Sequence, residues 1–238
     1  MMVWGDSFAM HIVPGILASD STAALVQATR SGCGPLLDVA PVARNDLSAT
    51  TQSAASCRNF NQSVLAYVEH QPSIHTVVLA SVFVQYVDNA VSQLATREGM
   101  INATPEAAAT YLDRTIAALR KLGKRVVVIA PPPSGGFDMG ACVERLRLGK
   151  PTWGPYSDCV IDRKIYVHKN SRVLEFLSVL GPKVSLFRFD GALCHGDTCA
   201  TTIQGIPIFR DGGHFSHDGI AYLGRQMSLL STLERLAR

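Results

Sequence analysis

The stretch Met2-Val3-Trp4-Gly5-Asp6-Ser7-Phe8 opens the chain and indicates its fold. Its first residues are apolar, as in a buried strand, and Gly5 permits a tight turn into a helix that starts near Phe8. Open α/β sheets bind ligands at the carboxyl ends of their strands, which is where this turn places Ser7. The Ser7 N–H would lie at a helix N-terminus, where developing negative charge is stabilised. Gly-Asp-Ser alone is a weak motif, because Asp and Ser are also ordinary N-cap residues.

Short β-branched runs alternate with helical patterns along the rest of the chain. This alternation predicts an α/β fold with a central parallel sheet and helices on both faces, a three-layer α/β/α sandwich. Strands are expected at residues 2–5, 25–29, 76–81, 125–130 and 184–189. Helices are expected at 8–17, 57–69, 104–122, 170–180 and 216–236, with a small hairpin arm at 206–209. The loop-rich stretch 134–162 is expected to leave the core as an insertion.

The composition indicates one globular domain over residues 1–238, because 47% of the residues are hydrophobic and only 17% are charged. The net charge is +3 and no Lys/Arg run occurs, so nucleic acid is not an expected partner. No apolar run approaches the roughly 20 residues of a membrane helix, and no signal peptide is visible. Since the first strand begins abruptly, we expect a domain cut from a longer protein, or a mature form without its leader.

Six cysteines occur, several of them beside Gly or Pro in loop-like stretches. Six cysteines allow about 15 full pairings. The simplest scheme joins nearest neighbours, which gives Cys33–Cys57, Cys142–Cys159 and Cys194–Cys199. Such disulfides would staple three loops and would imply an oxidising compartment such as the bacterial periplasm. The alternative is six unpaired thiols in a cytosolic protein. No CxxC is present, so we expect no structural zinc site.

A second motif, Asp211-Gly212-Gly213-His214, lies before the last expected helix. A serine nucleophile needs a base within hydrogen-bond reach, and that base needs a carboxylate to orient it. Asp211 and His214 can supply both to Ser7, although a histidine at a helix start commonly has no special role. His217 completes a His-x-x-His pair, but two such ligands alone make a poor zinc site. We therefore expect no metal here.

Taken together, Gly5-Asp6-Ser7 and Asp211-x-x-His214 resemble the motifs of the SGNH hydrolase family, in whose flavodoxin-like fold the two chain ends meet at the top of the sheet. The resemblance covers nearly the whole chain. Three segments and Cys142 sharpen it: residues 31–36 (SGCGPL), 57–61 (CRNFN) and 77–80 (VVLA). They resemble the SGNH domain fused behind membrane acyltransferase-3 proteins, which O-acetylate bacterial surface polysaccharides such as lipopolysaccharide O-antigen. The resemblance implies that Ser7, Asp211 and His214 form a catalytic triad.

One segment departs from the family pattern. Hydrolytic SGNH members carry Gly-x-Asn-Asp after the third strand, and its Asn helps to form the oxyanion hole, whereas residues 80–86 here read ASVFVQY. Phe83 lies about where the fused acyltransferase members often have a Trp. The oxyanion hole would then rest on the N–H groups of Ser7 and Gly32, with Gly34 as a close competitor for Gly32. Loss of one donor typically costs roughly 100- to 1000-fold in rate, so we expect a poor free-standing hydrolase or a site completed by the acceptor.

The resemblance implies an O-acetyltransferase that needs no cofactor. Ser7 would take an acetyl group delivered by a membrane acyltransferase-3 domain of the same polypeptide and pass it to a glycan acceptor. The chain would then be the C-terminal, periplasmic domain of a longer protein tethered to the inner membrane. Two alternatives stay open. One is a secreted carbohydrate O-acetylesterase with water as acceptor, and the other is a glycan-binding module with a vestigial triad.

Other residues receive plainer interpretations. Asp6 is expected to hold the turn, and His11, one helical turn beyond Ser7, is expected to pack or to line the rim. The His195-Gly196-Asp197 segment is expected to be a stapled surface loop, with a border of the acceptor groove as the alternative. Three aromatic residues are candidates for sugar stacking, although the first of them is expected in the core: Trp4, Trp153 and Tyr156.

Overall fold

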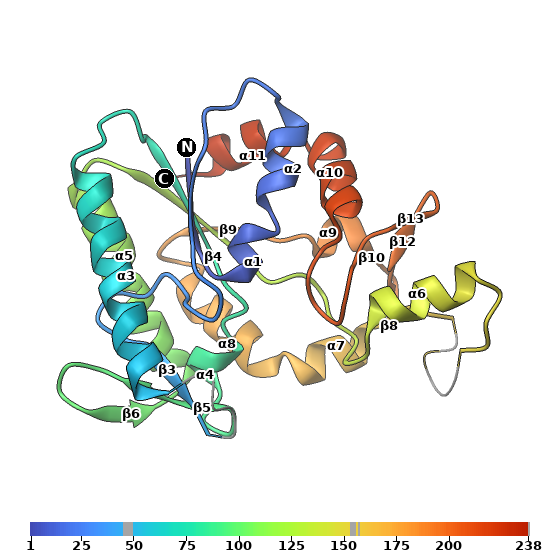
Figure 1. Cartoon of the computed structure of the whole chain (residues 1–238), viewed down its shortest axis with the longest axis horizontal. Helices are drawn as coiled ribbons and strands as arrows, with labels where there is room; N and C mark the ends of the chain where they lie inside the picture. The colour runs from blue at the N-terminus through green and yellow to red at the C-terminus, as the bar shows by residue number, and fades with distance from the viewer. Residues whose placement is uncertain (45–49, 153–155, 157, 238) are drawn as a thin grey trace.

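A five-stranded parallel sheet forms the centre of the computed structural model, which describes residues 1–44, 50–152, 156 and 158–237 (Figure 1). The strand order is β2-β1-β4-β7-β9, and every neighbouring pair is parallel. The strands are β1 (Met2–Gly5), β2 (Val26–Thr29), β4 (Thr76–Ala80), β7 (Arg125–Ile129) and β9 (Ser185–Phe187). The five strands predicted from the sequence are therefore confirmed, each to within two residues of its expected bounds.

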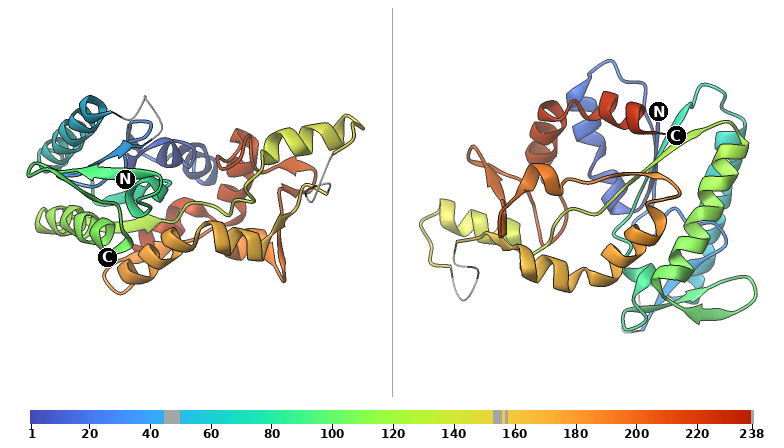
Figure 2. Two further views of the ribbon diagram at one scale, coloured as in Figure 1. Left: turned by 90° about the horizontal axis from the view of Figure 1, so that it is seen from below. Right: turned by 180° about the vertical axis from the view of Figure 1, so that it is seen from behind.

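Side chains of the sheet alternate between two cores, because successive residues of a strand point to opposite faces. In β1, Met2 and Trp4 join the core under α3 (Thr51–Glu69), α5 (Pro105–Lys121) and α8 (Ser171–Leu180). Val3 joins the opposite core under α1 (Ser7–Met10), α2 (Val13–Ser19), α10 (His217–Gln226) and α11 (Leu229–Leu236). Figures 1 and 2 show helices on both sides of the sheet. The predicted three-layer α/β/α sandwich is confirmed.

Three helices differ from the expected bounds. The helix expected at 8–17 is divided into α1 and α2 around His11 and Ile12. The closing helix is divided into α10 and α11 near Ser228, whose φ is 46°. The third, α3, begins at Thr51 instead of residue 57, because the Thr50 hydroxyl caps it by accepting a hydrogen bond from a backbone N–H of the first turn.

Smaller elements surround the sandwich. An antiparallel sheet in the order β3-β5-β6, which the sequence did not predict, consists of β3 (Ala40–Ala43), β5 (Ser92–Ala95) and β6 (Met100–Asn102). A second one, in the order β10-β11-β8, consists of β8 (Ile161–Asp162), β10 (Cys194–His195) and β11 (Thr198–Cys199). The expected hairpin arm forms from β12 (Thr202–Ile203) and β13 (Ile206–Pro207). Short helices complete the fold: α4 (Val84–Val87), α6 (Met139–Arg147), α7 (Arg163–Lys169) and α9 (Asp190–Leu193).

The six cysteines form three disulfides, Cys33–Cys57, Cys142–Cys159 and Cys194–Cys199, which are the nearest-neighbour pairs. The first ties the turn after β2 to α3, the second closes the insertion around α6, and the third bridges β10 and β11. Paired cysteines are typical of proteins outside the reducing cytosol.

The two ends of the chain pack against each other on one face of the sheet. Helix α2, in blue, lies beside α10, in red (Figure 1). Their backbones meet at a pair of glycines, where a Cβ on Gly224 would lie 2.0 Å from the carbonyl oxygen of Gly15. This close approach anchors the segment that follows Ser7 to the segment that follows His214. Separately, none of the helices within the described residues has both the length and the apolar character to cross a bilayer.

Candidate active site

Ser7 lies at the carboxyl end of β1, as predicted, and is the first residue of α1, one residue before the expected helix start. Gly5 ends β1 opposite Ala80 of β4, and its φ is 156°. A Cβ at Gly5 would lie 1.8 Å from the Ala80 carbonyl oxygen, so no side chain fits there. Asp6 is the N-cap of α1 and accepts a hydrogen bond from the Phe8 N–H at 2.8 Å. The close β1–β4 contact and this cap fix the backbone on both sides of the nucleophile candidate.

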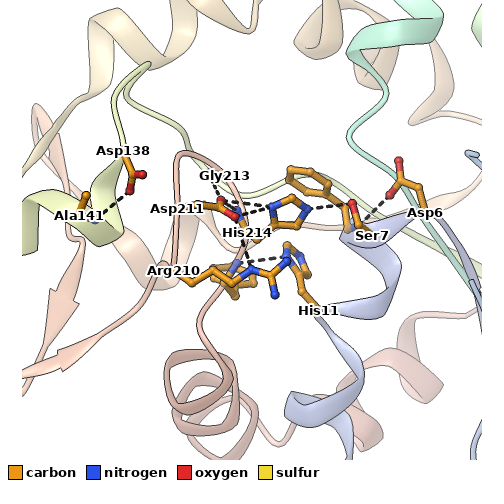
Figure 3. Close-up of polar contacts among 11 residues, drawn as sticks. Asp6, Ser7, His11, Asp138, Ala141, Arg210, Asp211, Gly213 and His214 are labelled. Carbon is orange, nitrogen blue, oxygen red and sulfur yellow. Dashed lines mark hydrogen bonds and ion pairs between the residues drawn. The ribbon is translucent and has the colours of Figure 1, made fainter. Parts of the chain in front are cut away.

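The Ser7 hydroxyl, the His214 imidazole and the Asp211 carboxylate form one hydrogen-bonded line (Figure 3). Ser7 Oγ lies 2.8 Å from His214 Nε2. On the other side of the ring, His214 Nδ1 lies 2.9 Å from Asp211 Oδ2 and 3.2 Å from Oδ1. With Nδ1–H donating to the carboxylate, Nε2 is free to accept the Ser7 proton, which is the tautomer that a general base requires. The three residues proposed from the sequence therefore lie in a geometry suited to nucleophilic catalysis.

The spacing of Asp211 and His214 follows from the loop between them. Asp211 Oδ1 accepts hydrogen bonds from the N–H groups of Gly213 at 2.9 Å and His214 at 2.7 Å, so the carboxylate organises its own loop. Partial burial alone would raise the pKa of Asp211, but these two N–H groups and the imidazole outweigh it and hold the pKa below its ordinary value. Arg210 Nε also lies 3.4 Å from Oδ2. Asp211 is thus ready to stabilise an imidazolium at neutral pH.

Asp6 ties the nucleophile turn to the segment after β4, which extends its expected role of holding the turn. Its Oδ2 accepts from the Ser81 hydroxyl at 2.6 Å and from the Val82 N–H at 3.1 Å. Burial raises the pKa of Asp6, and the donated hydrogen bonds from Ser81, Phe8 and Val82 oppose that rise. Because its oxygens are occupied by these donors, Asp6 serves to position the turn.

The two candidate oxyanion-hole donors are the N–H groups of Ser7, the first residue of α1, and of Gly32, in the turn after β2. Strand β2 pairs with β1 up to Thr29 opposite Gly5, so the following turn, with Gly32 at φ 70°, leaves the sheet next to the nucleophile. The N–H of its competitor Gly34 donates to the Tyr86 hydroxyl at 2.8 Å, which leaves Gly32 as the better candidate. Phe83 has a φ of 56° and is fully buried against Phe176, so it presents no polar group in place of the missing Asn.

The chemistry of His11 is the feature that the sequence did not reveal. The side chain is buried, with 8% of its surface exposed, so it packs and does not line a rim. Its Nδ1 accepts a hydrogen bond from the Phe215 N–H at 3.1 Å. Burial, together with the charges of His214 and Arg210, lowers the pKa of His11 to about 3, so the ring is neutral. Only its spacing of one helical turn from Ser7 signalled a place near the site.

The insertion reaches the same loop through the start of α6. A Cβ on Gly140 would lie 2.1 Å from the Arg210 carbonyl oxygen, so the two backbones are in direct contact. A Cβ on Gly212 would likewise lie 3.3 Å from the Phe137 carbonyl oxygen. Asp138 caps α6 by accepting from the Ala141 N–H at 2.8 Å (Figure 3). The stretch expected to leave the core thus includes a helix that supports the Asp211 loop.

The remaining candidates lie apart from this line. His217 is exposed and lies 3.4 Å from the carboxylate of Asp218, and the described residues contain no cluster of three possible metal ligands. The His195-Gly196-Asp197 segment is exposed, with His195 at the end of β10 and Gly196-Asp197 in the turn to β11. Trp4 is buried in the core, as expected, and Tyr156 stacks on Phe137 with ring centroids 4.3 Å apart. Trp153 lies outside the described residues.

Comparison with known proteins places this geometry in a family. In a search of the solved structures, the chain is similar to the periplasmic domain of a lipopolysaccharide acetyltransferase from Salmonella ser. Paratyphi A, with a TM-score of 0.65 and 18% identity over 97% of this chain and 82% of that one. It also matches a candidate acylhydrolase from Bacteroides fragilis, with a TM-score of 0.48 and 11% identity over 98% and 86% of the two chains.

A GDSL-like lipase from Bacteroides thetaiotaomicron matches with a TM-score of 0.48 and 10% identity over 98% and 87%. No curated protein matches the sequence. A family model described as "SGNH domain (fused to AT3 domains)" matches residues 1–228. The family match points to an enzyme that transfers or hydrolyses acyl groups. The chain belongs to the family of SGNH domains fused to acyltransferase-3 (AT3) domains.

Proposed function

We propose that the chain transfers an acetyl group to a hydroxyl of a bacterial surface glycan, such as lipopolysaccharide O-antigen, through an acyl-enzyme on Ser7. The observation that carries the proposal is the 2.8 Å approach of Ser7 Oγ to His214 Nε2, with Asp211 on the far side of the ring. The chain belongs to a family whose members are fused to AT3 domains, and this favours a glycan hydroxyl over water as the acceptor.

The proposed reaction has two half-reactions. In the first, Ser7 Oγ attacks the acetyl carbonyl while His214 Nε2 takes the hydroxyl proton, and the proton then passes to the departing group as the old acyl bond breaks. In the second, a sugar hydroxyl gives its proton to Nε2 and its oxygen attacks the acetyl-serine carbonyl. Collapse of that intermediate breaks the Ser7 ester, and Oγ takes the proton back from His214. Asp211 holds the imidazole in one tautomer throughout.

Negative charge on the carbonyl oxygen needs donors in both half-reactions. We assign them to the N–H groups of Ser7, at the start of α1, and of Gly32, in the turn after β2. An oxyanion hole made of these two N–H groups has one hydrogen-bond donor fewer than the hole of hydrolytic members, which also use the family Asn. A hole with fewer donors is expected to slow hydrolysis of simple esters, which is consistent with a site that works only with its own acceptor in place.

The acetyl donor belongs to a partner in this proposal. A membrane AT3 domain of the same polypeptide would deliver the acetyl group, and no cofactor would be bound here. Three disulfides favour a site in an oxidising compartment, and the similar Salmonella domain is periplasmic. We therefore place the domain in the periplasm, tethered at the inner membrane.

One observation favours a second candidate. The line from Ser7 to Asp211 is built entirely from side chains of this domain, so water can also serve as acceptor, which would make the domain a carbohydrate O-acetylesterase. Transfer and hydrolysis share the acyl-enzyme and differ only in what attacks it.

The test compares the wild type with Ser7→Ala and His214→Ala on p-nitrophenyl acetate, with intact mass spectrometry for the acetyl adduct. Ser73→Ala, in an exposed loop, is the matched control. We expect an adduct on Ser7 in the wild type and the control, and none in the two triad variants. Adding O-antigen oligosaccharide then measures how the acetyl group partitions between sugar and water. Mainly acetate would favour the esterase, while glycan binding that survives Ser7→Ala, with no adduct in the wild type, would leave a binding module.

A further inference from the structure

His11 connects the two motifs of the site through a side chain to which the proposed mechanism gives no role. It ends α1, where its backbone N–H donates to the Ser7 carbonyl oxygen at 3.0 Å. Its ring lies among the rings of Phe8, Phe215 and His214, with centroids 5.1, 4.9 and 5.6 Å away. Its Nδ1 accepts from the Phe215 N–H across 204 residues of sequence (Figure 3).

That acceptor adds one hydrogen bond to those that hold the loop with the base. The N–H groups of Gly213 and His214 donate to Asp211, and that of Ser216 donates to the Ile208 carbonyl oxygen. Both acceptors, Asp211 and Ile208, belong to the loop or to the arm that leads into it. The Phe215 N–H is the exception, because its acceptor comes from the nucleophile segment. Buried N–H groups need partners, so removal of His11 Nδ1 leaves this loop both loosened and unsatisfied.

The contacts close a small ring. It runs from Ser7 through one turn of α1 to His11, across to Phe215, back one residue to His214, and from Nε2 to Ser7 Oγ at 2.8 Å. The Ser7–His214 separation is therefore set by a single helical turn and one side chain, in addition to the packing of the longer elements around it. Phe8 also packs against the His214 ring, with the two ring centroids 4.4 Å apart.

The chemical state of His11 suits a positioning role and not simple packing. Neutral imidazole with Nδ1 as acceptor carries its hydrogen on Nε2, and within the described residues that buried atom has no hydrogen-bond partner. Such an N–H typically costs about 1–3 kcal/mol, which a phenyl ring at this place would avoid. The ring faces the charged or titratable groups of Arg210, Asp211 and His214. Its neutrality preserves the acceptor and adds no positive charge beside the imidazolium that forms in catalysis.

We propose that His11 is a positioning residue that holds His214 in register with Ser7 by accepting the Phe215 N–H. The inference rests on the proposed acyl-enzyme function for its kinetic consequence, but the geometry of the base can be tested without turnover. A misplacement near 1 Å is enough to cost about 100-fold in rate. His11 touches no reacting atom, so its loss should slow acylation of Ser7 and leave KM for the ester little changed.

Two variants separate the hydrogen bond from the packing. His11→Phe keeps a ring and loses the acceptor, whereas His11→Asn keeps an oxygen near the Nδ1 position and loses the ring. We expect Ser7 acylation by p-nitrophenyl acetate to fall about 100-fold in His11→Phe with thermal stability near neutral pH close to wild type, because one unpaired N–H replaces another. His11→Asn should be less stable and yet keep most of the acylation rate. His70→Phe, at an exposed helix end, is the control.

The second readout is the low-field proton NMR signal of the hydrogen bond between His214 and Asp211. We expect a sharp signal in wild type and His11→Asn and a broadened or lost one in His11→Phe. An unchanged acylation rate and NMR signal in His11→Phe would overturn the proposal. So would acylation rates that fall in step with thermal stability, with His11→Asn slower than His11→Phe. If the wild type forms no acyl-enzyme, the proposed function fails, and the NMR comparison still decides whether His11 positions the base.

Discussion

Acid should destabilise this domain through His11 well before its carboxylates protonate. Burial lowers the pKa of His11 to about 3 in the folded chain, while an unfolded histidine has a pKa near 6.5. Between pH 6.5 and about 3, His11 therefore binds a proton in the unfolded state but not in the folded state. Stability falls as the pH falls from about 6.5 to about 3, and above 6.5 His11 contributes no pH dependence.

The magnitude follows from the two pKa values. Each pH unit inside that window is worth about 1.4 kcal/mol, so lowering the pH from 7.5 to 4.5 should cost about 3 kcal/mol from this one group. For a chain of this size the loss corresponds to about 6–12 °C in Tm. Asp211, whose pKa is lowered, adds a loss of the same sign only below its ordinary value of 3.8. Asp6, whose pKa is raised, acts in the opposite direction.

Urea unfolding at a series of pH values, with the disulfides intact, measures the effect. The wild type is compared with His11→Phe, so that the titrating groups remote from His11 cancel in the difference. Between pH 7.5 and 4.5, we expect the free energy of unfolding to fall by about 3 kcal/mol less in the variant than in the wild type. Parallel curves, with a difference below about 0.5 kcal/mol, would show that His11 is not held neutral by burial and would refute the reasoning.

Two further predictions concern the nucleophile turn. Gly5→Ala should destabilise by about 3 kcal/mol or more, because its Cβ would meet the Ala80 carbonyl oxygen and force β1 from β4; urea unfolding measures it, and a loss under about 1 kcal/mol would contradict the close contact. Asp6→Asn should cost about 1–3 kcal/mol and slow acylation, since an amide has one acceptor oxygen and the Val82 N–H would lose its partner. Unchanged stability and rate in that variant would show that the Asp6 network does not position the turn.

The central sheet was predictable because its signals are local and strong. Residues 77–79 and 126–128 are apolar on both faces, so their buried strands follow from composition alone. The triad was predictable because Ser7 and His214 stand in motifs with a known relation. The β3-β5-β6 sheet was missed because its pairing is non-local. Its strands are short, and one contains Pro41, which gives little strand signal from the sequence.

The limits of helices and the role of His11 depend on tertiary contacts. The break between α1 and α2 falls where His11 reaches Phe215, and Pro14, in the first turn of α2, is a signal for it that the sequence analysis did not use. Helix α6 carried readable signals, an Asp138 cap and arginines in its last turn, but Gly140 weakened the helical pattern. That glycine is explained only by the backbone of Arg210 against it. The sequence alone does not show that His11 meets Phe215 or that Gly140 meets Arg210.

The hydrogen bond between Ser7 and His214 spans 207 residues, nearly the full length of the chain. A ribosome adding 5–20 residues per second needs roughly 10–40 s to go from the nucleophile to its base. During that interval the Ser7 hydroxyl lacks the imidazole of His214, which is the side chain placed to accept its proton. A truncated or stalled product therefore carries Ser7 in an inert form. Under the proposed function, Ser7 would therefore become a nucleophile only after the segment with His214 has been made and has packed beside α1, which would prevent acylation of the unfinished domain.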